Sequence, residues 1–173
     1  SKGKTLVVQT QDPKAPLDNF DLVIPPEHDQ LDGPNVLSTI GSPAYFAAGD
    51  IEQAALDFGD LANAPGLKIA VIIGGGSKTH SLPPGRAAEL EQELTALAGK
   101  GAKLWITLSR RTPEHARIRF RRMAEKLGAR FFENEATDGP NPYLAYLSLA
   151  DIVMVTEDSS NMISEAAWFA KPI

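Results

Sequence analysis

The residues best suited to chemistry lie near the carboxyl end of the chain, where acids and hydroxyls directly follow an apolar run. The run is Ile152–Val155, and the polar residues after it include Asp158, Ser159 and Ser160, ahead of a short helical pattern. This order predicts a buried strand, a tight turn and the start of a helix. Ligands of open α/β sheets bind at the carboxyl ends of the strands, and the free N–H groups of a helix start suit an anion such as phosphate. We therefore predict a nucleotide-type ligand site that includes these three residues.

Glu165 lies one turn into the expected helix and shares one helical face with other polar residues, Asn161, Ser164 and Trp168, because their spacing is i, i+3, i+4, i+7. The opposite face is expected to point into the core and carries Met162, Ala166, Phe169 and Ala170. Glu165 lies too far into the helix to cap its start. A carboxylate at this depth can instead accept two ribose hydroxyls while the helix start binds phosphate. The alternatives are structural: a surface glutamate, and a serine (Ser159 or Ser160) that serves only as the N-cap.

A glycine-rich loop follows an earlier expected strand, at residues 69–73. Its residues Gly74, Gly75, Gly76 and Ser77 match neither the phosphate-binding P-loop nor the dinucleotide-binding fingerprint. The N–H groups of a glycine turn can nevertheless approach a phosphate closely. A turn with a purely structural role is an equally favoured interpretation.

Two adjacent arginines, Arg110 and Arg111, lie between the next expected strand and its helix, again at the carboxyl edge of the sheet. The planar fork of a guanidinium matches the oxygens of a diphosphate. The alternative is that one of them forms an ion pair with Glu114 or another surface acid. Their position at the ligand-binding edge favours the diphosphate.

His28 and Asp29 follow an expected strand in the acidic first segment. A histidine beside an acid could act as a general base, and these two residues are our candidates for that role. The alternative is that neighbouring residues on a loop point away from each other. His80 and His115 do not show the spacing of metal ligands, so we predict no metal site.

The elements that must position these groups follow from hydrophobic periodicity and breaker residues. From residue 67 onward apolar runs alternate with helical patterns, which predicts right-handed crossovers and a parallel sheet. Thr112 followed by Pro113 predicts a helix N-cap. The strands are expected at residues 69–73, 102–108, 129–132 and 151–156, and the helices near residues 90–98, 113–127 and 143–149. Upstream, strands are expected at residues 6–8 and 20–24 and a helix at residues 49–62.

The composition is that of a globular protein, since 43% of the 173 residues are hydrophobic and 23% are charged. The net charge of −5 argues against a nucleic-acid-binding protein. Four arginines, Arg117, Arg119, Arg121 and Arg122, are expected on the solvated face of a helix, with contact to a membrane surface or a partner as the alternative. No apolar stretch reaches the roughly 18 residues of a membrane-spanning helix. The absence of cysteine fits a reducing compartment, and we expect the cytoplasm.

Five motifs in order carry a resemblance to a known family. They are Pro26-Glu-His-Asp29, Pro34-Asn-Val36, Gly74-Gly-Gly76, Ser109-Arg-Arg-Thr-Pro113 and the segment from Glu157 to Pro172. The last segment resembles the donor site of GT-B glycosyltransferases, in which a serine-rich helix start meets the diphosphate and a glutamate in the next turn holds the ribose. Together the five motifs resemble the mitochondrial-fission Elm-type family over nearly the whole chain.

The resemblance implies an α/β fold with a Rossmann-like parallel sheet in a GT-B-like two-domain architecture. Residues 1–45 would end the N-terminal domain, residues 46–66 would form a linker helix, and residues 67–173 would form an incomplete C-terminal nucleotide-binding domain. Because a further strand is expected after Pro172, we expect the chain to be a fragment truncated at both ends.

The function implied is that of a glycosyltransferase that takes a sugar from a nucleoside-diphosphate sugar and passes it to an unknown acceptor. Such an enzyme would need neither a metal nor a separate cofactor. A close alternative is a sugar-nucleotide epimerase on the same fold. An alternative of another class is a non-catalytic adaptor, because plant members of the family are associated with recruiting a dynamin-related protein to mitochondria.

Overall fold

The computed structural model describes residues 5–76 and 82–173, and these residues contain two separate parallel sheets. The larger sheet consists of β3 (Lys68–Ile73), β4 (Lys103–Leu108), β5 (Arg130–Phe132) and β6 (Ile152–Val155), arranged in the order β5-β4-β3-β6. All neighbours in this sheet are parallel. Counted from β3, the order is 3-2-1-4, which is the order of a doubly wound, Rossmann-like sheet. The expected α/β class with a parallel sheet is confirmed.

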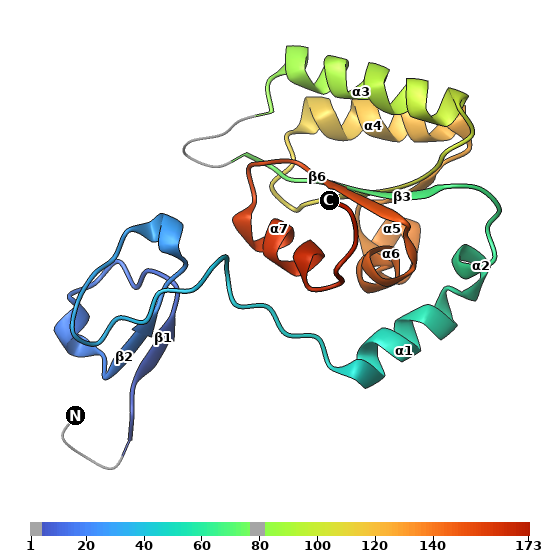
Figure 1. Cartoon of the computed structure of the whole chain (residues 1–173). Coiled ribbons are helices and arrows are strands. Elements are labelled where there is room, and N and C mark those ends of the chain that lie inside the picture. Colours follow the sequence, from blue (N-terminus) through green and yellow to red (C-terminus); the bar gives the residue numbers. More distant parts are fainter. Residues whose placement is uncertain (1–4, 77–81) are drawn as a thin grey trace.

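Helices cover both faces of the larger sheet, and Figure 1 shows α3 and α4 side by side on one face. These two are α3 (Pro84–Gly99) and α4 (Glu114–Leu127). The opposite face is covered by α2 (Gly59–Ala62), α6 (Tyr143–Leu149) and α7 (Ser160–Ala167), and α1 (Ala48–Asp57) packs against α6. The short helix α5 (Glu135–Asp138) follows β5. No helix within the described residues is both long and apolar enough to cross a membrane.

The core follows from the alternation of side chains along the central strands. In β3, Ile69, Val71 and Ile73 pack with α3 and α4, whereas Ala70 and Ile72 pack with the helices on the other face. Each face therefore has its own hydrophobic cluster, and every one of these five residues is at most 2% exposed. This burial on both faces explains why β3 is a continuous apolar run in the sequence.

The smaller sheet belongs to what we call the first unit, residues 5–45, in which β1 (Val8–Thr10) pairs in parallel with β2 (Leu22–Ile24). An extended segment at residues 36–39 also runs parallel to β2. Two 3-10 helices complete the unit, η1 (Leu17–Asn19) and η2 (Glu27–Asp29). The first strand lies two residues later than the sequence predicted.

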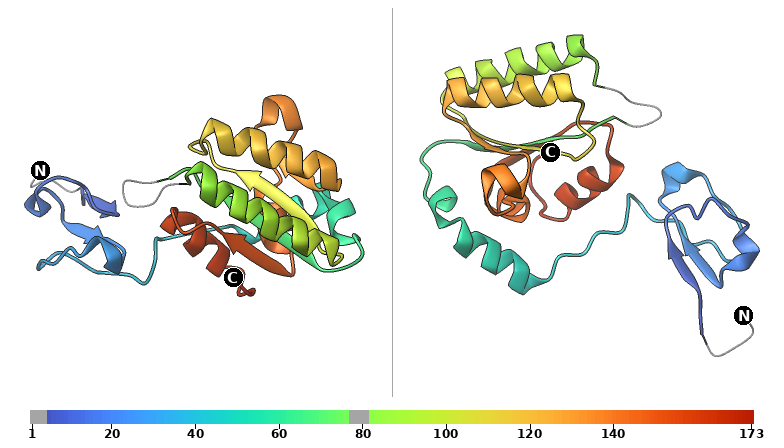
Figure 2. Two further views of the ribbon diagram at one scale, coloured as in Figure 1. Left: turned by 90° about the horizontal axis from the view of Figure 1, so that it is seen from above. Right: turned by 180° about the vertical axis from the view of Figure 1, so that it is seen from behind.

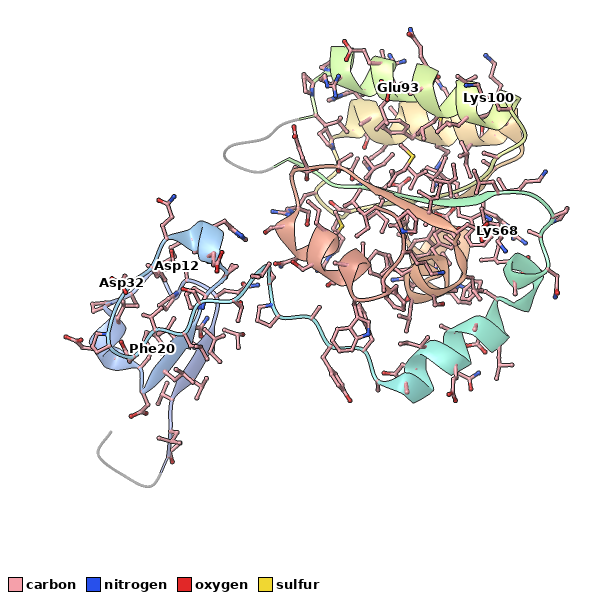
Figure 3. The ribbon with its side chains drawn as sticks, in the orientation of Figure 1. Asp12, Phe20, Asp32, Lys68, Glu93 and Lys100 are labelled. Carbon is pink, nitrogen blue, oxygen red and sulfur yellow. The ribbon has the colours of Figure 1, made fainter. Side chains whose placement is uncertain are left out.

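The carboxyl edge of the larger sheet faces the first unit, as Figures 1 and 2 show. Figure 3 labels Asp12 in the first unit and Lys68 at the amino end of β3, on the far side of the sheet. Two hydrogen bonds join the first unit to α7. Gln11 Nε2 donates to Asn161 Oδ1 at 3.3 Å, and the Ser42 N–H donates to Ser164 Oγ at 2.8 Å.

Two expectations about local structure are wrong. The single helix expected at residues 49–62 is interrupted at Phe58, where α1 ends and α2 begins. Thr112 does not cap α4, because Pro113 is the N-cap residue and the Thr112 side chain bonds elsewhere. Three of the four arginines expected on a solvated face of α4, Arg117, Arg119 and Arg121, are partly exposed and form ion pairs with acids outside the helix.

Candidate functional site

The order in which strands are added to the larger sheet reverses at β3. β4 and β5 are added on one side of β3, and β6 is added on the other side. β3 leads to α3 on one face, whereas its neighbour β6 leads to α7 on the other face. The two loops therefore diverge at the carboxyl ends of adjacent strands, which is where doubly wound sheets bind ligands. The loop after β4 lies against the same edge.

The loops after β3 and β6 are tied together by a chain of hydrogen bonds. The Gly74 N–H donates to Thr156 Oγ1 at 2.7 Å, and the Thr156 hydroxyl donates to Asp158 Oδ1 at 2.6 Å. The other carboxylate oxygen, Asp158 Oδ2, accepts from the Gly76 N–H at 3.0 Å. The glycine turn thus bonds to a side chain of the protein itself.

The glycines of this turn are required by close packing. A Cβ atom at Gly74 would lie 2.1 Å from Asp158 Oδ2, and one at Gly75 would lie 2.0 Å from the carbonyl carbon of Arg111. Gly76 has a φ of +82°, which also favours glycine. This geometry supports a structural role for the turn. Ser77, the fourth residue predicted here, lies outside the described residues.

Thr112 ties the loop after β4 to the end of β3. Its buried hydroxyl lies 3.1 Å from the carbonyl oxygen of Ile73 and 2.9 Å from that of Gly74, and it donates to both. Sequence reasoning missed this role because a threonine before a proline is also a good helix cap. The signal available was the position of Thr112 just after a buried strand, where carbonyl groups need donors.

One pocket at this edge, which we call the inter-unit pocket, lies between the first unit and the loops after β4 and β6. Its volume is about 320 Å³. Six residues predicted from the sequence line it: His28, Asp29, Arg111, Asp158, Ser159 and Ser160. Gln11, Asp12, Lys14 and Asn161 add further polar groups to its wall.

His28 and Asp29 lie in η2 and line the same pocket, with His28 Nε2 3.9 Å from Asp29 Oδ1. Asp29 Oδ2 also accepts from the backbone N–H of Asp12 at 3.3 Å. The His28 side chain is 51% exposed, whereas that of Asp29 is 23% exposed. The histidine is therefore accessible to a ligand, and the more enclosed acid lies near it at a distance too long for a hydrogen bond.

Ser159 is the N-cap of α7, because its hydroxyl accepts from the Met162 N–H at 3.4 Å. The Ser159 carbonyl also accepts the first backbone bond of the helix, from Ile163. Ser160, the first helical residue, is exposed and lines the inter-unit pocket. The helix start therefore opens into this pocket.

A second pocket, which we call the sheet-edge pocket, lies beyond the carboxyl ends of β3, β4 and β5 and has a volume of about 670 Å³. Arg110 and Glu165 line it, together with Ser109, Asn134 and Tyr143. The structure thus places eight of the predicted residues in these two pockets, and Gly74, Gly75 and Gly76 line neither of them. A further hollow of about 270 Å³, against Lys103 and Arg130, lies at the amino end of the sheet and contains none of them.

Glu165 is held in the sheet-edge pocket by Tyr143, whose hydroxyl donates to Glu165 Oε2 at 2.5 Å. Burial raises the pKa of Tyr143, and the hydrogen bond to the carboxylate raises it further. The phenol therefore stays protonated and remains a donor. One oxygen of Glu165 is fixed in this way, and the other has no partner among the described residues.

Arg110 and Arg111 differ from three arginines of α4, Arg117, Arg119 and Arg121, which all form ion pairs with acids. Glu114, the acid that we considered as their partner, lies 3.6 Å from Arg117 Nε. Among the residues that the structure describes, neither Arg110 nor Arg111 forms an ion pair with a carboxylate. Both are exposed, one beside each pocket, so the edge carries two guanidinium groups available to an anion.

The chain matches, over residues 1–173, the family model described as Mitochondrial fission ELM1. It is 28% identical over 192 residues to the mitochondrial fission protein ELM1 of Arabidopsis thaliana, covering 96% of this chain and 44% of that protein. It is 31% identical over 105 residues to the uncharacterized protein RP120 of Rickettsia prowazekii (strain Madrid E), covering 60% of this chain and 30% of that protein. The chain spans less than half the length of these relatives, and no solved structure matches it. Because the family match extends over its whole length, the chain belongs to the mitochondrial fission ELM1 family.

Proposed function

We propose that this protein is a glycosyltransferase-like enzyme that binds a nucleoside-diphosphate sugar at the carboxyl edge of the larger sheet. The observation that carries the proposal is the inter-unit pocket. It combines a histidine–acid pair from the first unit with Arg111 and the start of α7 from the second. Candidate groups for proton transfer and for diphosphate binding therefore face one volume.

In this proposal the diphosphate lies at the start of α7. The first N–H groups of a helix have no acceptor within the helix, and they carry the positive end of its dipole. Ser160 and Arg111 adjoin that position in the inter-unit pocket, and Arg110 adjoins it from the sheet-edge pocket. These groups would stabilise the charge of the departing diphosphate.

The nucleoside occupies the sheet-edge pocket in this arrangement, with its ribose hydroxyls donating to Glu165. Tyr143 holds one carboxylate oxygen in place and leaves the other for the ligand. A volume of about 670 Å³ lies within the range of small-molecule sites. Glu165 is five residues from Ser160, or about 7.5 Å along the helix axis, which leaves room for a ribose beside Glu165 and its phosphates at the helix start.

The proposed reaction is the displacement of the diphosphate by an acceptor hydroxyl. His28, beside Asp29, takes the proton from that hydroxyl. The acceptor oxygen then forms a bond to the anomeric carbon of the sugar, and the bond from that carbon to the diphosphate breaks. The electron pair leaves with the diphosphate, and the arginines and the helix start stabilise it. No metal is required in this scheme.

The two separate sheets support a GT-B-like division of the chain. We propose that residues 1–45 belong to one domain and residues 67–173 to a second, nucleotide-binding domain, with residues 46–66 linking them. The inter-unit pocket then corresponds to the cleft between the domains. An epimerase acting on the same sugar nucleotide would use the same donor site and would differ in its product.

A non-catalytic adaptor is the second candidate function, and exposed aromatic residues favour it. Tyr45 is 81% exposed and Trp168 is 50% exposed, and their rings meet edge to face with centroids 6.4 Å apart. Ile40, five residues before Tyr45 in the stretch between β2 and α1, is 94% exposed. Such a surface suits a protein partner. A relative named for mitochondrial fission agrees with this alternative.

Thermal melting in the presence of nucleotides tests the donor site. The chain would be melted alone and with 1 mM UDP, GDP, ADP, CDP or TDP. A dissociation constant of about 0.1 mM would stabilise the protein by roughly 1.4 kcal/mol, or a few degrees. We expect a shift with one nucleotide, lost in Glu165→Ala and kept in Glu125→Ala, a control at an exposed position of α4. A cooperative melt that no nucleotide shifts would reject the donor site and favour the adaptor.

A further inference from the structure

We propose that Asp158 is a tethered anion. Its carboxylate fills the anion-binding turn of Gly74–Gly76 and thereby directs the phosphates of a ligand towards Arg111 and the start of α7. The second half of this proposal rests on the proposed function, whereas the first half does not. Asp158 would thus determine where phosphate binds without being the group that binds it.

The bonding of the carboxylate carries the proposal. One carboxylate oxygen accepts directly from the Gly76 N–H at 3.0 Å, and the other is linked to the Gly74 N–H through the Thr156 hydroxyl. Successive backbone N–H groups in such a turn form a concave site that suits a phosphate or a carboxylate equally. In this protein an oxygen pair of its own chain already occupies that site.

The packing around the turn leaves space for the Asp158 carboxylate only because Gly74 and Gly75 have no side chains. Gly74 lacks the side chain whose first atom would lie 2.1 Å from Asp158 Oδ2, and Gly75 accommodates the backbone of Arg111 in the same way. Two consecutive glycines therefore allow two other loops to approach the turn. Any residue with a side chain at either position would expel the carboxylate or the arginine backbone.

The negative charge of Asp158 determines on which side of the loop a phosphate can bind. A phosphate entering the turn would have to displace the carboxylate or lie next to it, and two like charges in contact repel each other strongly near a protein surface. Arg111 and Ser160 line the inter-unit pocket, which Asp158 also borders, and the guanidinium of Arg111 offsets the charge of the carboxylate there. A phosphate is therefore favoured there, away from the glycine turn.

The first experiment tests the tethered anion without any nucleotide. Asp158→Ala removes the carboxylate, and we expect faster amide exchange of peptides covering residues 74–76 and a lower melting temperature. Because the vacated turn should accept a free anion, formate or inorganic phosphate at millimolar concentration should restore part of both. Asp32→Ala, a change at an exposed loop position shown in Figure 3, should show none of these effects. Unchanged exchange at residues 74–76, or no response to either anion, would overturn the proposal.

The second experiment separates charge from shape and does not depend on the stability of the alanine variant. Asp158→Asn keeps an oxygen for the Gly76 N–H and an amide group for Thr156 but removes the negative charge. We expect it to keep slow exchange at the turn and to bind inorganic pyrophosphate about 3- to 30-fold more tightly than the unmodified protein, as expected for loss of one nearby like charge. Equal or weaker binding would show that Asp158 does not repel phosphate, and would overturn the directing role.

The two experiments distinguish failure of this proposal from failure of the proposed function. If no nucleotide binds but anions rescue Asp158→Ala, the tethered anion stands and the donor site falls. If a nucleotide binds and neither Asp158 variant behaves as expected, the donor site stands and the tethered anion falls.

Discussion

Two groups of arginines lie close together in the sequence but play different parts in the structure. Arg117 and Arg121 of α4 form ion pairs with Glu133, and Arg121 also pairs with Asp138 at 3.1 Å. Arg110 and Arg111, at the edge of the sheet, pair with no carboxylate in the described part of the chain. The first group is committed to the fold, and the second is available to a ligand. A cluster of positive charge in a sequence therefore does not locate a binding site, because the site is where the charge is left without a partner.

Asp138 is an acid that binds Arg121, one of the ion-paired arginines of α4. Its carboxylate accepts from Arg121 and from the backbone N–H groups of Glu133 and Asn134, the latter two at 2.7 and 3.2 Å. The Arg121 guanidinium also lies over the Phe131 ring, 4.7 Å from its centroid. These contacts hold the loop after β5, which forms one wall of the sheet-edge pocket.

The largest effect is expected from removing this acid. Asp138→Ala leaves a guanidinium and two N–H groups without their acceptor, so it should lower the free energy of unfolding by about 2–3 kcal/mol. Chemical denaturation measures the change. Asp32→Ala, at an exposed loop position, should change stability by no more than about 0.5 kcal/mol. A loss for Asp138→Ala as small as that of this control would remove the distinction between committed and available arginines.

The next largest effect is expected for the arginines at the edge of the sheet. It should appear in the affinity for nucleotide and not in the free energy of unfolding. Arg111→Ala should leave the free energy of unfolding within about 0.5 kcal/mol of the unmodified value. It should weaken binding of the nucleotide identified by melting about 10- to 100-fold, the usual size for loss of a charge-assisted contact. Titration calorimetry measures the affinity, and Arg122→Ala, at an exposed position of α4, is the matched control. Equal effects of the two substitutions would show that Arg111 does not contact the ligand.

A smaller effect is expected from acid. Burial raises the pKa of Asp138, but the hydrogen bonds from Arg121 and from the two N–H groups outweigh it and hold the pKa below 3.8. A depressed pKa stabilises the fold above the unfolded value and loses that contribution as the pH falls through the folded value. The stability difference between the unmodified protein and Asp138→Ala should therefore be constant near neutral pH and shrink below about pH 3.8. Denaturation curves at several pH values measure it, and a difference independent of pH would contradict the ion pair.

The smallest effect is expected from Tyr143→Phe. This substitution removes the hydroxyl that holds Glu165, and it tests whether Glu165 can bind a ligand without that hydrogen bond. Losing this hydrogen bond should cost about 0.5–1.5 kcal/mol of stability. It should weaken nucleotide binding only a few-fold, because Glu165 itself remains. The raised pKa of Tyr143 adds a second expectation: the unmodified protein should lose stability as the pH rises above 10, and the phenylalanine variant should lose less. Identical alkaline behaviour of the two proteins would contradict the buried hydrogen bond.

Local patterns were sufficient to predict the regular parts of the fold. The run from Ile69 to Ile73, the apolar stripe of α4 and the capping serine before α7 depend on periodicity and on neighbours along the chain, and all three appear where expected. Contacts between distant segments were not predictable in this way. The pairing of Arg117 with Glu133 depends on the crossover that brings α4 beside the loop after β5.

The candidate site shows the same division. Its edge of the sheet and most of its lining residues followed from acids, hydroxyls and arginines placed after expected strands. The division into two pockets, the locking role of Thr112 and the occupation of the glycine turn by Asp158 required the relative positions of three loops. Single-sequence reasoning left the glycine turn open between two roles, because an N–H group that binds phosphate and one that binds a carboxylate have the same sequence signature.

The positions of the two tryptophans provide built-in optical probes for separate events. Trp105 is 2% exposed within the larger sheet, so its emission should be blue-shifted in the native protein and should report global unfolding. Trp168 is half exposed at the end of α7 and contacts Tyr45 and Phe46, which lie in the segment between β2 and α1. Its emission should respond to quenchers and to movement of that segment. Replacing either indole by phenylalanine would therefore give a protein whose fluorescence follows one of the two processes alone.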